Sequence, residues 1–131
     1  MVILVIGLSG CGKSTYARHM IGDHGLCYDL DAIAAAFRLR TPHEEYSPQA
    51  RKMANDLFYG FIRNARDYSD MIVIIRTAPE IPDVEAMRPD NIVWMKTRHE
   101  FRVHGNENNA MRRIYDIKAY AEENGIPFEV R

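Results

Sequence analysis

A short segment near the start of the chain, residues 7–15, constrains the fold more than any other part of the sequence. It reads Gly-Leu-Ser-Gly-Cys-Gly-Lys-Ser-Thr and matches the pattern G-x-x-x-x-G-K-[ST] in full. An apolar run, residues 1–6, precedes it, and a segment with helical character, residues 13–20, follows it. This order of strand, glycine-rich turn and helix is the context in which the pattern wraps backbone around phosphate groups.

The residue types in this loop predict how a nucleoside triphosphate would bind. Backbone N–H groups point at the phosphates, Lys13 reaches the β- and γ-phosphates, and the Ser14 hydroxyl ligates Mg²⁺. The following helix adds the positive end of its dipole. We therefore expect ATP, or another nucleoside triphosphate, together with Mg²⁺. The expected nucleotide-binding residues are Gly7, Ser9, Gly10, Cys11, Gly12, Lys13, Ser14 and Thr15.

Two other interpretations of a glycine-rich loop are weaker here. A dinucleotide-binding turn needs G-x-G-x-x-G, and Thr15 stands where its third glycine belongs. A turn that binds nothing is the other alternative, and the strand and helix that flank the loop disfavour it.

Length and charge limit what surrounds this loop. A chain of 131 residues with 47% hydrophobic content can bury one sizeable core, so we expect a single domain over residues 1–131. A formal net charge of −1 provides no overall basic field for long nucleic acids. No signal-peptide pattern or apolar run of about 18 residues is present, so we expect a cytoplasmic protein without membrane segments. Cys11 and Cys27 fit a reducing compartment.

Beyond the loop, strand patterns alternate with helical patterns, which predicts a parallel sheet wrapped by helices. The later strands are expected at residues 25–31, 71–75, 91–95 and 126–130. The later helices are expected at residues 32–40, 48–67 and 108–123. Three prolines between residues 79 and 89 allow at most a short helix there. In the middle helix, Met53, Leu57, Phe61 and Ala65 recur every four residues and predict its buried face.

Asp29 and Asp31 stand two positions apart at the expected end of the second strand. At that spacing both carboxylates face one side and would line a pocket beside the phosphates. Asp31 also stands where it would cap a helix that begins at residue 32, and the cap alone is a simpler interpretation.

The apolar strand, the phosphate loop, the Asp-x-Asp pair, the five-strand alternation and an arginine-bearing stretch before the last helix together resemble the small P-loop kinases. That group includes nucleoside monophosphate, shikimate and polynucleotide kinases. The resemblance implies a three-layer α/β P-loop NTPase fold, with a five-stranded parallel sheet in the order 2-3-1-4-5. It also implies transfer of the γ-phosphate of ATP to a small acceptor, such as a nucleotide or a nucleic-acid end, and a lid at residues 97–109.

The resemblance also implies roles for charged residues. Asp31 is the expected base or acceptor anchor and Asp29 the expected Mg²⁺ helper, with the two roles exchangeable. Arg98 and Arg102 fall in the lid and would stabilise the charge on the transferring phosphate. Arg112, or its neighbour at 113, begins the last helix and would also reach the phosphates.

The end of the third strand departs from the common pattern. Arg76 stands where many P-loop proteins place an aspartate, and an anionic acceptor would explain it. Arg38 could extend the same anion site, although a solvated helix face is the better explanation of it. Without an acid at residue 76, a nucleotide-binding or NTPase module that acts as a switch or assembly factor stays an alternative to a kinase. The sequence carries no indication of the oligomeric state.

Overall fold

The computed structural model describes every residue except 9, 43–46 and 97–106. The predicted site residues Ser9, Arg98 and Arg102, and most of the predicted lid, lie outside the described residues. The strands are β1 Val2–Ile6, β2 Leu26–Asp29, β3 Ile72–Arg76, β4 Asn91–Trp94 and β5 Phe128–Val130. The helices are α1 Lys13–Ile21, α2 Leu30–Ala36, α3 Pro48–Ala65, α4 Ile81–Met87 and α5 Glu107–Asn124.

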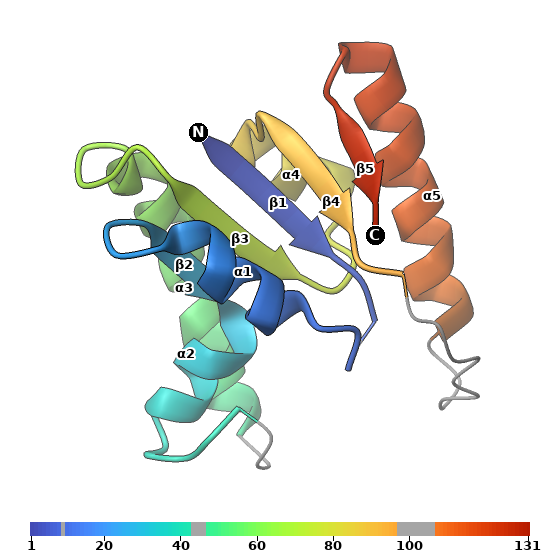
Figure 1. Ribbon diagram of the computed structural model, residues 1–131. Helices are drawn as coiled ribbons and strands as arrows, with labels where there is room; N and C mark the ends of the chain where they lie inside the picture. Colours follow the sequence, from blue (N-terminus) through green and yellow to red (C-terminus); the bar gives the residue numbers. More distant parts are fainter. Residues whose placement is uncertain (9, 43–46, 97–106) are drawn as a thin grey trace.

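The five strands form one sheet in the order β2-β3-β1-β4-β5, and every neighbouring pair is parallel. This confirms the expected α/β architecture and strand order. β1 is central, and its last residue, Ile6, pairs with Arg76 on one side and Trp94 on the other. All strand arrows therefore end at one edge of the sheet, where the loop that follows β1 begins (Figure 1).

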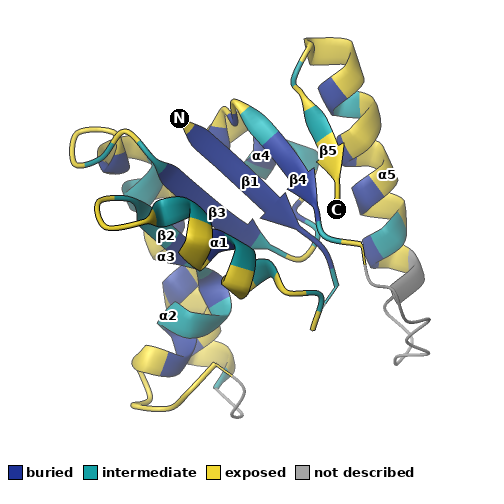
Figure 2. Ribbon diagram, viewed as in Figure 1, coloured by how far each residue is buried: buried dark blue, intermediate teal, exposed yellow. Residues whose placement is uncertain are grey.

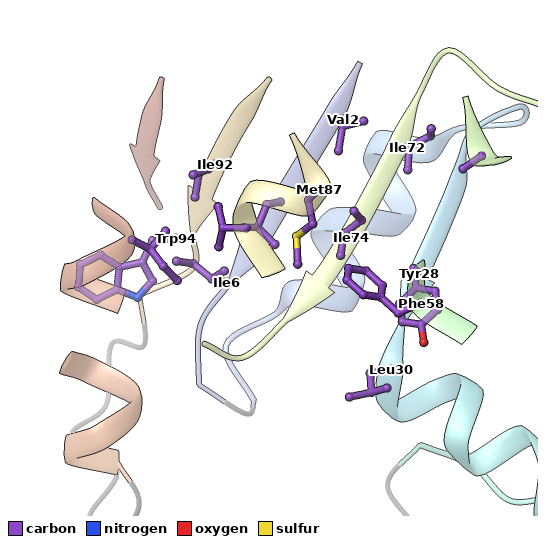
Figure 3. Close-up of a cluster of buried hydrophobic side chains, with 14 of the residues drawn as sticks. Val2, Ile6, Tyr28, Leu30, Phe58, Ile72, Ile74, Met87, Ile92 and Trp94 are labelled. Atoms are coloured by element: carbon purple, nitrogen blue, oxygen red, sulfur yellow. The ribbon is translucent and has the colours of Figure 1, made fainter. Parts of the chain in front are cut away.

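The two faces of the sheet bury separate clusters of apolar side chains, because alternate residues of each strand point to opposite faces. Leu4 and Ile74 belong to the larger cluster, into which α2, α3, α4 and α5 pack. Val5 and Val73 belong to the smaller one, to which α1 contributes Ala17. Figure 2 shows β1 and most of β3 buried, and Figure 3 shows side chains of the larger cluster.

The buried face of α3 agrees with the prediction in part. Ala65 is buried and Phe61 packs against the larger cluster, whereas Met53 and Leu57 are 55% and 49% exposed. The helix also buries Phe58 and two more alanines. Phe58 lies against Tyr28 of β2, with ring centroids 5.0 Å apart, and the Tyr28 hydroxyl donates a hydrogen bond to the carbonyl of Ala54. Small side chains let α3 approach β2 and α2 closely. The contact face of α3 is therefore marked by its alanines, although they have little apolar area, and not by the larger side chains of Met53 and Leu57.

The start of α2 also differs from the prediction. The helix begins at Leu30, two residues earlier than expected, and its N-cap is Asp29 instead of Asp31. Asp29 Oδ1 accepts hydrogen bonds from the backbone N–H groups of Asp31, at 3.1 Å, and Ala32, at 3.4 Å. Asp31 therefore lies in the first helical turn and not on a strand. Within the described part of the chain, no helix combines the length and apolar character needed to cross a membrane.

Candidate functional site

The predicted phosphate loop leaves β1 at the carboxyl edge of the sheet. It lies between the ends of β3 and β4, the two strands that pair with β1. The Gly7 N–H donates to the carbonyl of Thr77, after β3, at 3.0 Å. On the other side, a Cβ built on Gly7 would lie 2.5 Å from the carbonyl oxygen of Met95, after β4. Gly12, at the start of α1, has φ +89°, a conformation that glycine adopts without strain. Glycines at these two positions therefore let the loop pass close to the sheet and turn into α1.

Lys13 folds back onto the loop from the first position of α1. Its Nζ donates to the carbonyls of Gly7, at 2.6 Å, and Leu8, at 2.9 Å, and lies 3.7 Å from Cys11 Sγ. An ammonium group has three donors and no acceptor. The lysine is thus held at the loop, with its charge where the sequence predicts phosphates.

The next residue along α1 lies beside the end of β2. Ser14 Oγ is 3.4 Å from Asp29 Oδ2, the carboxylate oxygen that does not take part in the helix cap. A hydroxyl and a carboxylate oxygen are ligands of the kind that Mg²⁺ takes in phosphate-transfer sites, together with waters and substrate phosphates. The donor set therefore fits the predicted magnesium site. Ser14 and Asp29 would hold the ion there, and the ion would neutralise charge on the nucleotide phosphates.

Two neighbouring cavities open at this edge of the sheet. We call the first the loop cavity; it has a volume of about 370 Å³ and is lined by Gly10, Gly12, Lys13, Ser14, Thr15, Asp29, Asp31, Pro42 and Ile75. We call the second the arginine cavity; it has a volume of about 360 Å³, and its lining includes Arg51, Asn55, Arg76, Asp83 and Arg113. Lys13, Asp29, Asp31 and Ile75 line both. The two cavities therefore meet at the lysine and the two aspartates.

Arg76 extends from the end of β3 into the wall of the arginine cavity. Its guanidinium carbon lies 5.2 Å from the centre of the Phe58 ring, and its Nη2 lies 3.8 Å from Asp83 Oδ2. The hydroxyl of Tyr59 donates a hydrogen bond to Asp83 Oδ1, which raises the pKa of Tyr59 above its ordinary value. Arg76 is thus supported by α3 on one side and α4 on the other.

Asp31, which lines both cavities, lies beside Arg51, which lines the arginine cavity. Arg51 Nη1, on the first turn of α3, lies 3.9 Å from Asp31 Oδ1, and both side chains are about half exposed. An ion pair this open to solvent is worth at most about 1 kcal/mol. This ion pair therefore contributes little to the free energy of folding.

The structure brings together most of the predicted site residues that it describes. Gly10, Cys11, Gly12 and Thr15 lie in or directly after the loop, Asp29 and Asp31 line both cavities, and Arg76 lines the arginine cavity. Arg113, rather than Arg112, is the arginine of α5 in the cavity lining. Arg38 is exposed beyond the end of α2 and is not among the described residues that line either cavity.

The lining residues that were not predicted include three with polar or charged side chains from α3 and α4: Arg51, Asn55 and Asp83. Arg51 and Asn55 are four residues apart and so share one face of α3, a spacing that could have identified them. Asp83 lies in α4, in the proline-rich stretch where the sequence predicted mostly loop, and no local pattern identifies it.

No protein-family model matches the chain, and no curated protein matches it in sequence. Among solved structures, a chain of the Pnkp1/Rnl/Hen1 RNA repair complex matches with a TM-score of 0.56 and 13% identity, over 93% of this chain and 45% of that one. An unliganded sugar kinase from Janibacter sp. HTCC2649 matches with a TM-score of 0.40 and 15% identity, over 87% of this chain and 65% of that one. The chain thus spans less than two thirds of either protein. At this identity the comparison with the repair complex establishes a shared α/β fold.

Proposed function

We propose that this chain is an ATP-dependent phosphotransferase that moves the γ-phosphate to the hydroxyl group of a small acceptor, such as a nucleotide or a nucleic-acid end. One observation carries the proposal: the loop cavity and the arginine cavity meet at Lys13, Asp29 and Asp31. A protein that only binds or hydrolyses a nucleotide needs no second cavity at the end of the triphosphate. A kinase needs a cavity for the acceptor at that place.

In this reaction the acceptor oxygen attacks the γ-phosphorus, and the bond from that phosphorus to the β–γ bridging oxygen breaks. ADP leaves with the electron pair of the broken bond, and the acceptor hydroxyl loses its proton. Lys13, at the junction of the cavities, offsets negative charge on the β- and γ-phosphates. Arg113, which lines the acceptor side, supplies a second cation, and Arg98 and Arg102 stay predictions for the same task.

The two aspartates take separate roles in the proposal. Asp29 has one oxygen engaged by the backbone of α2 and the other beside Ser14, which suits magnesium binding. Asp31 lines both cavities from the first turn of α2, so it is the carboxylate to accept the hydroxyl proton. This chooses between two assignments that the sequence left exchangeable.

The test is incubation with γ-labelled ATP, Mg²⁺ and a panel of nucleosides, nucleotides, sugars and oligonucleotides with free hydroxyl ends. Oligonucleotides belong in the panel because the matched repair complex acts on RNA, as its name states. We expect label in at least one acceptor, and none with the Lys13→Ala variant. If ATP binds and no acceptor is labelled, the kinase proposal fails. Release of labelled phosphate without an acceptor would then indicate an NTPase module.

A further inference from the structure

The arginine cavity contains a buried cationic group whose hydrogen-bonding capacity is incompletely used. The Arg76 side chain is 14% exposed, and its Nη1 is buried with no hydrogen-bond partner among the described residues. Leaving a buried donor unsatisfied is costly, so an atom of this kind calls for a partner, such as a bound ligand or an ordered water. Arg76 is the described residue whose side chain carries such an atom.

The neighbours of Arg76 orient its guanidinium group without using all of its hydrogen-bond donors. Asp83 approaches Nη2 only to 3.8 Å, which is an ion pair longer than a hydrogen bond, and it shares its other oxygen with the Tyr59 hydroxyl. The Phe58 ring covers the guanidinium group at 5.2 Å and offers no hydrogen-bond acceptor in its plane. The group is therefore fixed in place while Nη1 keeps a donor for another partner.

Other charges in this cavity do not change that conclusion. Its lining includes four cations, Lys13, Arg51, Arg76 and Arg113, and four acids, Asp29, Asp31, Glu80 and Asp83. Lys13 bonds the loop carbonyls, Asp29 caps α2, and Asp31 lies near Arg51. The described acid that pairs with Arg76 is Asp83, and it does so through Nη2 alone.

We infer that Arg76 is the anchor for an oxyanion on the acceptor itself, so that the acceptor is a hydroxyl compound that also carries a phosphate or a carboxylate group. This inference rests on the proposed function and narrows its substrate class. A guanidinium group matches both oxyanions geometrically, and charge-assisted hydrogen bonds are roughly twice as strong as neutral ones. The acceptor lies with its anion toward Arg76 and its hydroxyl toward Asp31, which lines both cavities.

The first test is equilibrium binding, measured by calorimetry in the presence of Mg²⁺ and a non-hydrolysable ATP analogue. The probes are matched pairs: a nucleoside and its 3′-monophosphate, and a sugar and its carboxylic acid. The wild type should bind at least one charged member more tightly than its neutral partner, by about 10- to 100-fold. The phosphate and carboxylate arms show which oxyanion is preferred. If no charged probe binds better than its neutral partner, the inference is overturned.

The second test uses variants of the anchor. Arg76→Gln should abolish the preference for the charged probe and leave the affinity for the ATP analogue unchanged, which also shows that the variant is folded. Arg76→Lys keeps the charge without the planar fork and should restore part of the preference. Arg63→Gln, at an exposed position of α3, is the matched control and should behave as the wild type. Equal charge preference in Arg76→Gln and the wild type would overturn the inference.

Failure of the inference and failure of the kinase proposal are distinguishable. Transfer of labelled phosphate to neutral and charged acceptors with the same KM, in both the wild type and Arg76→Gln, would keep the kinase and reject the anchor. Arg76-dependent binding of a charged probe without any phosphate transfer would keep the anchor and reject the kinase.

Discussion

Asp29 Oδ2 lies 3.4 Å from Ser14 Oγ, while the other oxygen of the same carboxylate accepts hydrogen bonds from the backbone of α2. One side chain thereby joins the end of β2 to the first turn of α1 and to the start of α2. Because the two oxygens have different partners, substitution can separate the helix cap from the proposed magnesium site.

The first prediction concerns Asp29→Asn and Asp29→Ala. Asparagine caps a helix about as well as aspartate, so Asp29→Asn should keep the wild-type free energy of unfolding, whereas Asp29→Ala should lose about 1 kcal/mol. Both variants lack the charge beside Ser14, so both should need more Mg²⁺ to bind ATP. Urea unfolding and ATP titrations at several Mg²⁺ concentrations measure the two effects. Wild-type magnesium dependence in Asp29→Asn would remove Asp29 from the metal site.

A second prediction concerns the lysine of the loop. Lys13→Ala should weaken ATP binding by at least about tenfold, because the ammonium group makes charge-assisted contacts with the phosphates. Lys52→Ala is the control, since Lys52 is exposed on α3 and is not part of either described cavity lining. A fluorescent ATP analogue gives both affinities. Equal affinity in the two variants would contradict the assignment of the loop.

The third prediction separates catalysis from binding at the junction of the cavities. Asp31→Asn should lower the rate of phosphate transfer by about 100-fold, the lower range for loss of a general base, and leave ATP affinity unchanged. Asp56→Asn, at an exposed position of α3, should change neither quantity. An equal loss of transfer and ATP affinity in Asp31→Asn would indicate a structural role instead.

The fourth prediction compares two glycines. A Cβ at Gly7 would lie 2.5 Å from the backbone oxygen of Met95, so Gly7→Ala should destabilise the protein and weaken ATP binding. A Cβ at Gly60, within α3, meets no atom within 4 Å, so Gly60→Ala should raise the free energy of unfolding by about 0.5–1 kcal/mol. Urea unfolding of both variants checks the signs. A Gly7→Ala protein as stable as Gly60→Ala would disprove the close approach.

The fifth prediction concerns the two thiols. Burial, with a smaller contribution from the Asp29 charge, raises the pKa of Cys27 to about 12. The native protein therefore keeps Cys27 protonated at pH 8, and a thiolate-specific reagent should modify it far more slowly than after unfolding. Since the folded pKa lies above the unfolded value, Cys27 should also make stability fall as pH rises from about 9 toward 12.

Variants with one thiol each make this measurement direct. Cys11→Ser leaves Cys27 and Cys27→Ser leaves Cys11, and the rate of colour release from a chromogenic disulfide follows each thiol in turn. Between pH 9 and 12, stability should fall less steeply in Cys27→Ser than in Cys11→Ser. Equal modification rates of Cys27 in the native and unfolded protein would contradict the prediction.

The strands were predictable because their signals are local. The apolar run before Gly7 and the β-branched residues from Ile72 to Ile75 each indicate a buried parallel strand within a few positions. The strand order came from the family resemblance, because spacing along a chain does not specify which strands pair. The loop and the Asp-x-Asp pair had sequence signals of their own, and both lie at the site.

The acceptor side was less predictable because it is assembled by contacts between distant segments. Asp83 meets Arg76 only because α4 packs beside the end of β3, and Arg51 approaches Asp31 only because α3 packs against α2. The predicted cap of α2 was wrong by two residues, since Asp29 and Asp31 have equal capping propensity and only the course of the backbone distinguishes them. Contacts between residues that are distant in the sequence cannot be recognised from its local periodicity.

Of the described helices, α1 alone packs on the smaller apolar face of the sheet. It has nine residues, which is shorter than the length at which isolated helices are stable in water. Its first two residues are Lys13 and Ser14, so a ligand bound at its N-terminus would stabilise the helix that covers that face of the sheet. Thermal unfolding should then report nucleotide binding: the melting temperature should rise with the logarithm of ATP concentration at concentrations well above the dissociation constant.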